Sequence, residues 1–579
     1  MSNTNTVSRR DLLALGMLAA LPAGLIAGAA RAASDAKANA MRELDRFIAG
    51  YCAAMNAPGL TLGLAGADGP IRTAAYGYAD LAAKLPVSTS HLFEIGSITK
   101  SFVGLTILQL HDEGKVDLQA PIRAYLPWLS METSYGEILV HHLLTHSSGM
   151  PDDAPLIPVS PERRPRQALK PGAEFHYSNW GYDALGRLIE AVDGRSWPAA
   201  VTARIFKPVG MSDTTPTITS ASRPRIAQSY MPLHDDRPYP RHGALVPAGN
   251  LSVEFAAGSI ASTPRDMALY MQMILNRGQA NGARIVSEES FKLFSTPHIR
   301  APAFGPEAGY GYGIAVDKLD GHTRLRHTGG MVSFMSAIHM DLDSKIGAFA
   351  SINAQLGYRP NPVAQLAVQL LRAEKEHGKP PQIPDFDPSL KVEAPASYSA
   401  VYTSRAGRQI EIKNTAERLS LTAGGRTIPL QQSDDGSFIA DEPGFNLFPI
   451  VFERADSAKS DPNDKAKPAI VALANGSEWY ARARFKGEPA LEPLETLSKY
   501  VGQFYSENPW NGTIRIVQRQ QKLWAGGTDQ LVPIGNHLFR LGSEPASPGE
   551  LEYTEFIDGK PQLLWIDGVM FQRVSEAAA

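Results

Sequence analysis

The stretch GSITKSFVGLTILQL, residues 96–110, decides the fold of this chain. From Ser101 to Asp112 the side chains are apolar on nearly every side of a helix, which predicts a helix buried inside a core. Ser97 precedes this helix, where the helix dipole and free backbone N–H groups favour a developing negative charge. Lys100 stands one turn further on, facing the same side. A desolvated amine can lose its proton and take one from a serine hydroxyl, so the pair predicts a nucleophilic serine with its base.

A Ser-x-x-Lys spacing alone is weak evidence, because a surface helix start explains most such pairs. Ser34 and Lys37 have the same spacing at the end of an N-terminal apolar segment and carry no meaning there. The context of Ser97 and Lys100 therefore has to decide.

A second candidate element is Tyr177-Ser178-Asn179, which leads into a predicted helix over Asp183–Val192. The phenol of Tyr177 can act as a general base if a nearby cation holds it as phenolate, and Asn179 offers a donor and an acceptor to a substrate amide. The alternative is a core tyrosine followed by a helix-capping asparagine.

A third candidate element is His327-Thr328-Gly329-Gly330, after a strand-like segment. Two glycines let a backbone approach a ligand closely, as an edge strand does when a peptide-like substrate lies along it. His327 and Thr328 are then placed to hold a substrate carboxylate. The alternative is a Gly-Gly hairpin turn.

The chain divides into a mixed part and a β-rich part. Residues 38–375 alternate apolar runs, such as 60–65 and 346–352, with helical patterns, which predicts an α/β domain. The proline-rich residues 376–395 read as a linker.

The β-rich part repeats itself and predicts two related all-β units, 396–487 and 498–575. Tyr402 corresponds to Phe504, and the turn Asn475-Gly476 corresponds to Asp567-Gly568. Many short strands with Gly-Gly and Asn-Gly turns favour small barrels over sandwiches.

Together the three elements resemble the active site of the serine β-lactamase and DD-peptidase superfamily, in its class C β-lactamase-like branch. The resemblance covers roughly residues 40–375 and includes two further stretches, 142–150 and 256–263. It implies an antiparallel sheet flanked by helices with a helical subdomain.

By this resemblance, Ser97 forms an acyl-enzyme, Lys100 and Tyr177 shuttle its proton, and Asn179 holds the substrate amide. The N–H groups of Ser97 and Gly330 would form the oxyanion hole. The superfamily's β-lactamases carry lysine where this chain has His327, which instead resembles carboxypeptidase and D-aminopeptidase members. A neutral imidazole attracts a carboxylate less than an ammonium does.

The N-terminus resembles a twin-arginine export signal over residues 1–32, with Arg9-Arg10, an apolar run and the cleavage pattern Ala30-Arg31-Ala32. The alternative is an uncleaved membrane anchor. We expect a periplasmic or secreted protein without a stable membrane anchor.

Cys52 is the sole cysteine, so no internal disulfide forms. We interpret Cys52 as a small packed residue rather than as a nucleophile.

Composition points to a small-molecule or peptide substrate rather than nucleic acid, because 56 basic and 59 acidic residues give a formal net charge of −3 without long one-sign blocks.

We expect no cofactor and no metal site. His141, His142 and His146 are interpreted as structural histidines, and Arg163, Arg164 and Arg166 as a solvated loop.

The first functional hypothesis is a peptidase or amidase acting on D-amino-acid-containing peptides. The alternatives are an esterase or β-lactamase with the same acyl-enzyme chemistry, and a penicillin-binding receptor that acylates but barely turns over. The β units are candidates for recognition or for assembly into a homo-oligomer.

Overall fold

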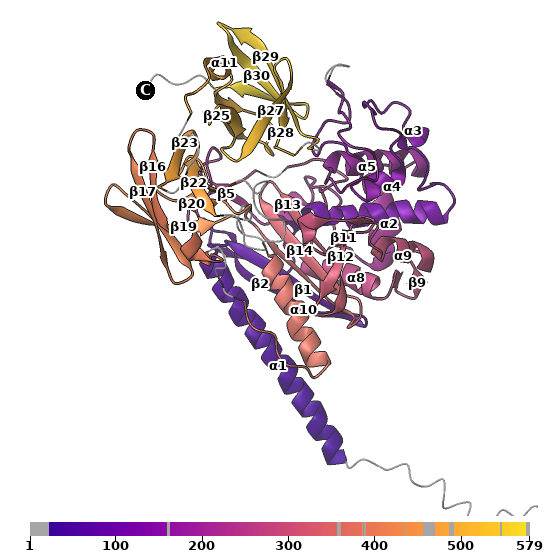
Figure 1. Ribbon diagram of the computed structural model, residues 1–579. Coiled ribbons are helices and arrows are strands. Elements are labelled where there is room, and N and C mark those ends of the chain that lie inside the picture. Colours follow the sequence, from indigo (N-terminus) through magenta and orange to yellow (C-terminus); the bar gives the residue numbers. More distant parts are fainter. Residues whose placement is uncertain are drawn as a thin grey trace, which may run out of the picture.

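The computed structural model in Figure 1 describes residues 23–158, 163–249, 251–355, 360–384, 386, 390–433, 435–455, 469–483, 485, 491–544 and 547–574, with side chains from residue 35 on. Residues 1–22 of the predicted export signal lie outside the described residues. The long helix α1 (Ala23–Ala54) begins in the last part of that signal, residues 23–32. Within the described part of the chain, no helix has both the length and the apolar character to cross a bilayer.

The mixed part is built on an antiparallel sheet. Among the described residues it has nine strands in the order β10-β11-β12-β13-β14-β15-β1-β2-β3. The apolar runs predicted as strands are its central members, and their side chains are buried on both faces. The strands span β1 Gly59–Gly66, β2 Gly69–Asp80, β3 Leu85–Pro86, β10 Ile299–Arg300, β11 Gly309–Tyr310, β12 Ala315–Leu319, β13 His322–Met331, β14 Phe334–Asp341 and β15 Ile346–Ile352.

Helices cover both faces of this sheet. On one face α1 lies beside α10 (Asn361–Lys375), and the two share a core with the central strands. On the other face α8 (Pro264–Leu275) packs on β1 and β15. Cys52 of α1 is partly buried in the first of these cores, and burial raises the pKa of its thiol to about 12, which fits a packing role.

The predicted buried helix is α2 (Thr99–Asp112), and the prediction of its burial is confirmed. Around it gather the helices of a subdomain, seen at the right of Figure 1. They include α4 (Val140–Leu144), α5 (Asn179–Asp193), α6 (Trp197–Val201) and α9 (Glu288–Ser295). A helix that neighbours enclose on all sides gives its first turn a fixed place in the molecule.

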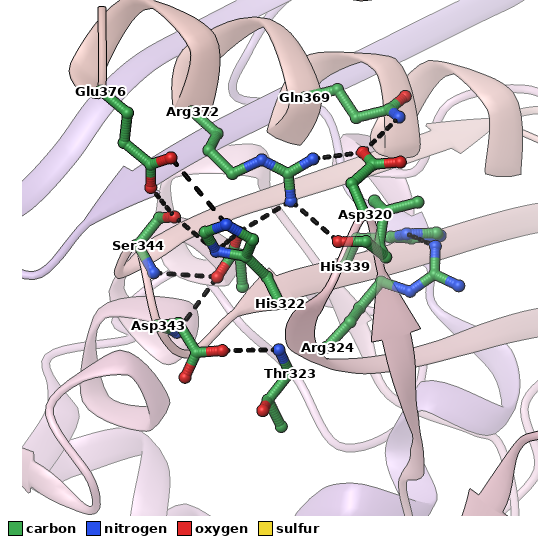
Figure 2. A network of polar contacts seen from close by, with 12 residues as sticks. Asp320, His322, Thr323, Arg324, His339, Asp343, Ser344, Gln369, Arg372 and Glu376 are labelled. Atoms are coloured by element: carbon green, nitrogen blue, oxygen red, sulfur yellow. Dashed lines mark hydrogen bonds and ion pairs between the residues drawn. The ribbon is translucent and has the colours of Figure 1, made fainter. Parts of the chain in front are cut away.

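A polar network joins α10 to the turn between β12 and β13 and to the end of β14 (Figure 2). The guanidinium of Arg372 donates to Asp320 and Asp341, and His322 Nδ1 lies 3.3 Å from Asp341 Oδ2. In the described residues His322, Asp341 and Asp343 have potential ligand atoms within 4.8 Å of one another. These atoms already have partners within the protein, including the Thr323 amide on Asp343.

The β-rich part forms two closed barrels, so the prediction of two barrel-like units is confirmed. Strands β16–β23 close through β16 and β23, and β24–β31 close through β24 and β31. The first barrel has β16 Ala400–Ser404, β17 Gln409–Thr415, β18 Arg418–Ala423, β19 Arg426–Gln432, β20 Phe438–Ala440, β21 Ile450–Arg454, β22 Ile470–Asn475 and β23 Glu478–Arg482. The second has β24 Gly502–Tyr505, β25 Thr513–Arg519, β26 Lys522–Ala525, β27 Asp529–Gly535, β28 Leu538–Leu541, β29 Glu550–Ile557, β30 Lys560–Ile566 and β31 Val569–Arg573.

The second barrel sits over the helical subdomain (Figure 1). Arg163 forms an ion pair with Glu552 at 2.7 Å and lies over the Trp565 ring at 3.9 Å, while Arg166 lies 3.5 Å from Glu550. The interpretation of this arginine cluster as a solvated loop is therefore wrong for Arg163, whereas Arg166 is exposed. Both arginines contact the second barrel.

Candidate active site

Ser97 lies in the single-turn helix Gly96–Ile98 that leads into α2, where it meets strand β13. The approach is so close that side chains are excluded on both sides. A Cβ on Gly96, whose φ is +54°, would lie 2.5 Å from the Gly330 nitrogen. A Cβ on Gly329 would lie 1.8 Å from the Ile95 oxygen.

These contacts predict that Gly329→Ala destabilises the protein. The added methyl would press on backbone, which cannot rotate away as a side chain does, so we expect a loss of about 3 kcal/mol. Gly330→Ala is the matched control, since its Cβ would meet only the flexible Met335 side chain at 3.4 Å. Thermal unfolding of both variants measures the difference; equal melting temperatures would contradict the close approach.

Lys100 lies at the bottom of the site with no exposed surface. Its Nζ is 3.0 Å from Ser97 Oγ, 2.6 Å from Asn179 Oδ1 and 2.9 Å from the Ala257 carbonyl oxygen. The two carbonyl oxygens can only accept hydrogen bonds, whereas the serine hydroxyl can donate. A neutral amine satisfies all three contacts, with two N–H groups for the carbonyls and its lone pair for the Ser97 proton.

Burial also changes the pKa of the Lys100 amine. It lowers this pKa to about 8, although the negative charges of Asp152, Asp183 and Asp153 act to raise it. At pH 7 roughly a tenth of the molecules therefore hold Lys100 uncharged. The site can supply a base beside Ser97 without a histidine.

Tyr177 faces the same point from the loop before α5. Its ring centroid lies 4.7 Å from Lys100 Nζ. Burial raises the pKa of Tyr177, and the neighbouring Ser97 hydroxyl only partly opposes this. The phenol is therefore protonated at neutral pH. It can relay a proton by donating its own O–H proton and accepting another in exchange, so that it carries no net charge.

Asn179 begins α5 and is held by its neighbours, while the helix cap is Ser178, whose hydroxyl accepts from the Gly181 amide. The alternative of a capping Asn179 is therefore wrong. Asn179 Oδ1 accepts from Lys100, and its Nδ2 donates to Asp153 at 2.9 Å. The second Nδ2 hydrogen and the second lone pair of Oδ1 remain for a substrate.

His327 lies in an aromatic cluster with Phe304, Tyr310 and, with ring centroids 6.4 Å apart, Tyr177. It is 2 % exposed, with Nε2 2.9 Å from the Tyr310 hydroxyl and Nδ1 2.5 Å from the Thr328 carbonyl oxygen. Burial, and next the charge of Lys100, lower the pKa of His327 to about 3, so the ring is neutral. A substrate carboxylate would have to displace one of these contacts to bind it.

Thr328, Gly329 and Gly330 lie inside β13, paired with Ala337, Ser336 and Met335 of β14. The alternative of a Gly-Gly hairpin turn is therefore wrong, because the chain turns after Met331. Gly330 is exposed beside Ser97, at the edge of the cavity described next. The structure thus gathers the three elements at one place.

A cavity of about 730 Å³ opens over Ser97, and the second barrel forms part of its wall. From the catalytic side it is lined mainly by apolar groups, among them Leu156, Trp197, Phe255 and Met331. From the barrel come residues of the loop after β24 and of the β30–β31 turn, namely Asn508, Trp510, Asn511, Gly568 and Val569. The sequence held no signal for these barrel residues.

The charged groups of the cavity wall are mainly acidic. Asp153, Asp183 and Glu254 line it, against Arg187 as the one basic residue in that lining. Burial raises the pKa of Asp183 to about 7, and that of Asp152, behind Asn179, to about 6. Nothing in the sequence marked these carboxylates as part of the site, since acidic residues are commonplace both in loops, as at Asp152, and on helices, as at Asp183 of α5.

Comparisons with known proteins agree with this geometry. A family model described as Beta-lactamase matches residues 44–372. Protein flp of Staphylococcus aureus (strain MW2) is 28% identical over 318 residues, 52% of this chain and 60% of that protein, so the chain spans about three fifths of that relative. Penicillin-binding protein 4 of Amycolatopsis lactamdurans is 25% identical over 296 residues, 47% of this chain and 75% of that protein.

A solved structure extends the likeness beyond the mixed part. It is the octameric penicillin-binding protein homologue from Pyrococcus abyssi, which aligns with a TM-score of 0.54 and 25% identity. The alignment covers 76% of this chain and 100% of that chain.

Proposed function

The chain belongs to the Beta-lactamase family, whose members are serine hydrolases, and from this premise we propose that it is a peptidase or amidase that forms an acyl-enzyme on Ser97. The observation that carries the proposal is the 3.0 Å contact between Ser97 Oγ and a fully buried Lys100 Nζ. Serine becomes nucleophilic only when a neighbouring group takes its proton, and this amine is placed and tuned to do so.

In the proposed acylation step, Ser97 Oγ attacks the substrate carbonyl carbon while its proton passes to neutral Lys100. The carbonyl oxygen becomes an oxyanion held by the N–H groups of Ser97 and Gly330. The tetrahedral intermediate then collapses, the C–N bond breaks, and the leaving amine receives a proton through Tyr177. Water later attacks the ester carbonyl carbon while neutral Lys100 takes its proton. The C–O bond to Ser97 then breaks, Ser97 Oγ receives that proton back from Lys100, and the acid product leaves.

The substrate proposal rests on charge and on resemblance. The acidic lining and the neutral, occupied His327 favour a substrate that presents an amino group over one recognised through a carboxylate. D-configuration comes from the likeness of the His327 motif to D-aminopeptidase and carboxypeptidase members. We therefore place D-amino-acid amides and peptides first.

A substrate panel tests this choice. D-alanyl peptides, D-amino-acid amides, their L-enantiomers, short-chain aryl esters and a chromogenic cephalosporin are compared by kcat/KM. We expect the D-amides and D-peptides to lead. Turnover of the cephalosporin or of the esters alone would overturn the substrate proposal while leaving Ser97 as nucleophile.

An esterase is the second candidate, favoured by the apolar part of the cavity lining. A slow penicillin-binding receptor is separated from both by intact-mass measurement after penicillin exposure. A lasting adduct on Ser97 supports a receptor, and rapid return of the free mass supports a hydrolase.

Trp510→Ala is expected to raise KM about tenfold for substrates with bulky apolar groups and to change kcat little, because the indole contributes wall area and no chemistry. Tyr505→Ala is the matched control: Tyr505 is a similarly exposed aromatic of the same barrel, 45% against 38%, and does not line the cavity. Steady-state kinetics on a series of acyl sizes measures the effect. Equal KM values for both variants would contradict a role of Trp510, and of the barrel wall it forms, in substrate binding.

Export and assembly complete the proposal. We propose that the twin-arginine segment directs the protein to the periplasm or outside the cell, which fractionation of cells carrying an Arg9→Lys, Arg10→Lys variant tests. The penicillin-binding protein homologue from Pyrococcus abyssi is octameric, which supports a homo-oligomer here, with the barrels as candidate contacts. Light scattering of the full chain measures the assembly.

A further inference from the structure

His146 lies directly behind Tyr177 and takes no part in the proposed chemistry. It follows α4 and adopts a φ of +54°, a conformation that few residues other than glycine, asparagine, aspartate and histidine accept readily. It is 1 % exposed.

His146 contacts the backbone on both sides of Tyr177. Its Nδ1 accepts from the Ser178 amide at 3.0 Å, and its carbonyl oxygen accepts from the His176 amide at 2.7 Å. Its ring stacks on the Tyr177 ring with centroids 4.2 Å apart and an interplanar angle of 28°. One residue thus fixes the chain before Tyr177, the chain after it and the ring itself.

Packing alone does not account for a histidine at this place. Because the Ser178 amide donates to Nδ1, the ring proton lies on Nε2. This Nε2 is buried and has no hydrogen-bond partner in the part of the chain that the structure describes. An unpaired buried donor is destabilising, so an apolar ring would suit the aromatic cluster better if the cluster were the only demand.

We propose that His146 is a positioning residue that holds the Tyr177 phenol at Ser97 through its Nδ1 contact with the Ser178 amide. The inference rests on the proposed role of Tyr177. Without the Nδ1 acceptor, the Ser178 amide has to seek another partner, and the residue beside it moves with the loop. A displacement of the order of 1 Å in a proton-transfer group can cost about 100-fold in rate.

His146 is not itself the base. Burial, and next the charge of Lys100, hold the pKa of His146 well below its usual range, and its Nδ1 lone pair is already used. It therefore stays neutral across the working pH range. Its replacement removes no titration from the pH–rate profile.

Two variants separate the acceptor from the ring. His146→Asn keeps an acceptor close to the Nδ1 position and tolerates a positive φ, but loses the ring. His146→Phe keeps the ring and loses the acceptor. His141→Phe is the control, because His141 lies on α4, the short helix that His146 follows, and also makes a side-chain hydrogen bond, to Tyr312 at 2.7 Å.

The measurement is the single-turnover acylation of Ser97 by a chromogenic ester, with melting temperatures and pH profiles of every variant. We expect His146→Phe to lose about 10- to 100-fold in the acylation rate constant with little change in ester binding, and His146→Asn to stay within about threefold of wild type. His141→Phe should match wild type in rate.

Three outcomes would overturn the inference: equal losses in the Asn and Phe variants, a Phe variant no slower than His141→Phe, or a limb of the pH profile that disappears with His146. Failure of the proposed function is a different result, because the wild-type protein itself would then give no adduct on Ser97.

Discussion

Replacing Ser97 with alanine is expected to abolish acylation and to lower turnover by about 10⁴-fold or more. The alanine variant keeps Lys100, Tyr177 and the cavity but has no atom that can form the ester. Packing should change little, because the lost hydroxyl lies at the cavity floor rather than in the core. Intact mass after exposure to penicillin and to an aryl ester measures the adduct directly, and steady-state assays measure turnover.

The control for this substitution is Ser90→Ala, an exposed serine in a turn a few residues before the site. It should acylate and turn over as the wild type does. A Ser97→Ala protein that still gains the mass of the probe would move the nucleophile elsewhere and leave the Lys100 contact without a catalytic meaning.

The sequence was sufficient to predict those parts of the site that depend on a local pattern of residues. Ser97 and Lys100 are one helical turn apart, and the apolar surroundings of α2 follow from its composition, so their meeting at 3.0 Å was predictable. The two barrels were predictable because the strand and turn pattern occurs twice, with Tyr402 and Phe504 at equivalent, fully buried positions.

Contacts between distant segments were not predictable from one sequence. The carboxylates behind Asn179 and the Ala257 carbonyl that completes the Lys100 environment come from separate loops. The orientation of His327 depends on Tyr310, which lies on another strand. Trp510 reaches the cavity only because the second barrel packs over the helical subdomain, and no periodicity encodes how two folded units meet.

Lys100 is expected to set the pH dependence of acylation. Burial lowers its pKa from the ordinary 10.5 to about 8, so the uncharged amine becomes more abundant as the pH rises through 8. The acylation rate constant should therefore rise with an apparent pKa near 8 and then level off. An amine in water would still be gaining activity at pH 10.

Lys100→Met and Lys100→Arg both remove the base, since a guanidinium does not give up its proton in proteins. We expect each to slow acylation by about 10³-fold and to lose the limb near pH 8, although arginine keeps the positive charge. Tyr177→Phe is the matched comparison: it should also be slow but should keep that limb, because the titrating amine is still present. If the limb survived in Lys100→Met and vanished in Tyr177→Phe, the phenol would be the group that takes the serine proton, and the buried amine would serve to hold it in place. Both groups face Ser97, so only this crossed set of variants assigns the proton to one of them.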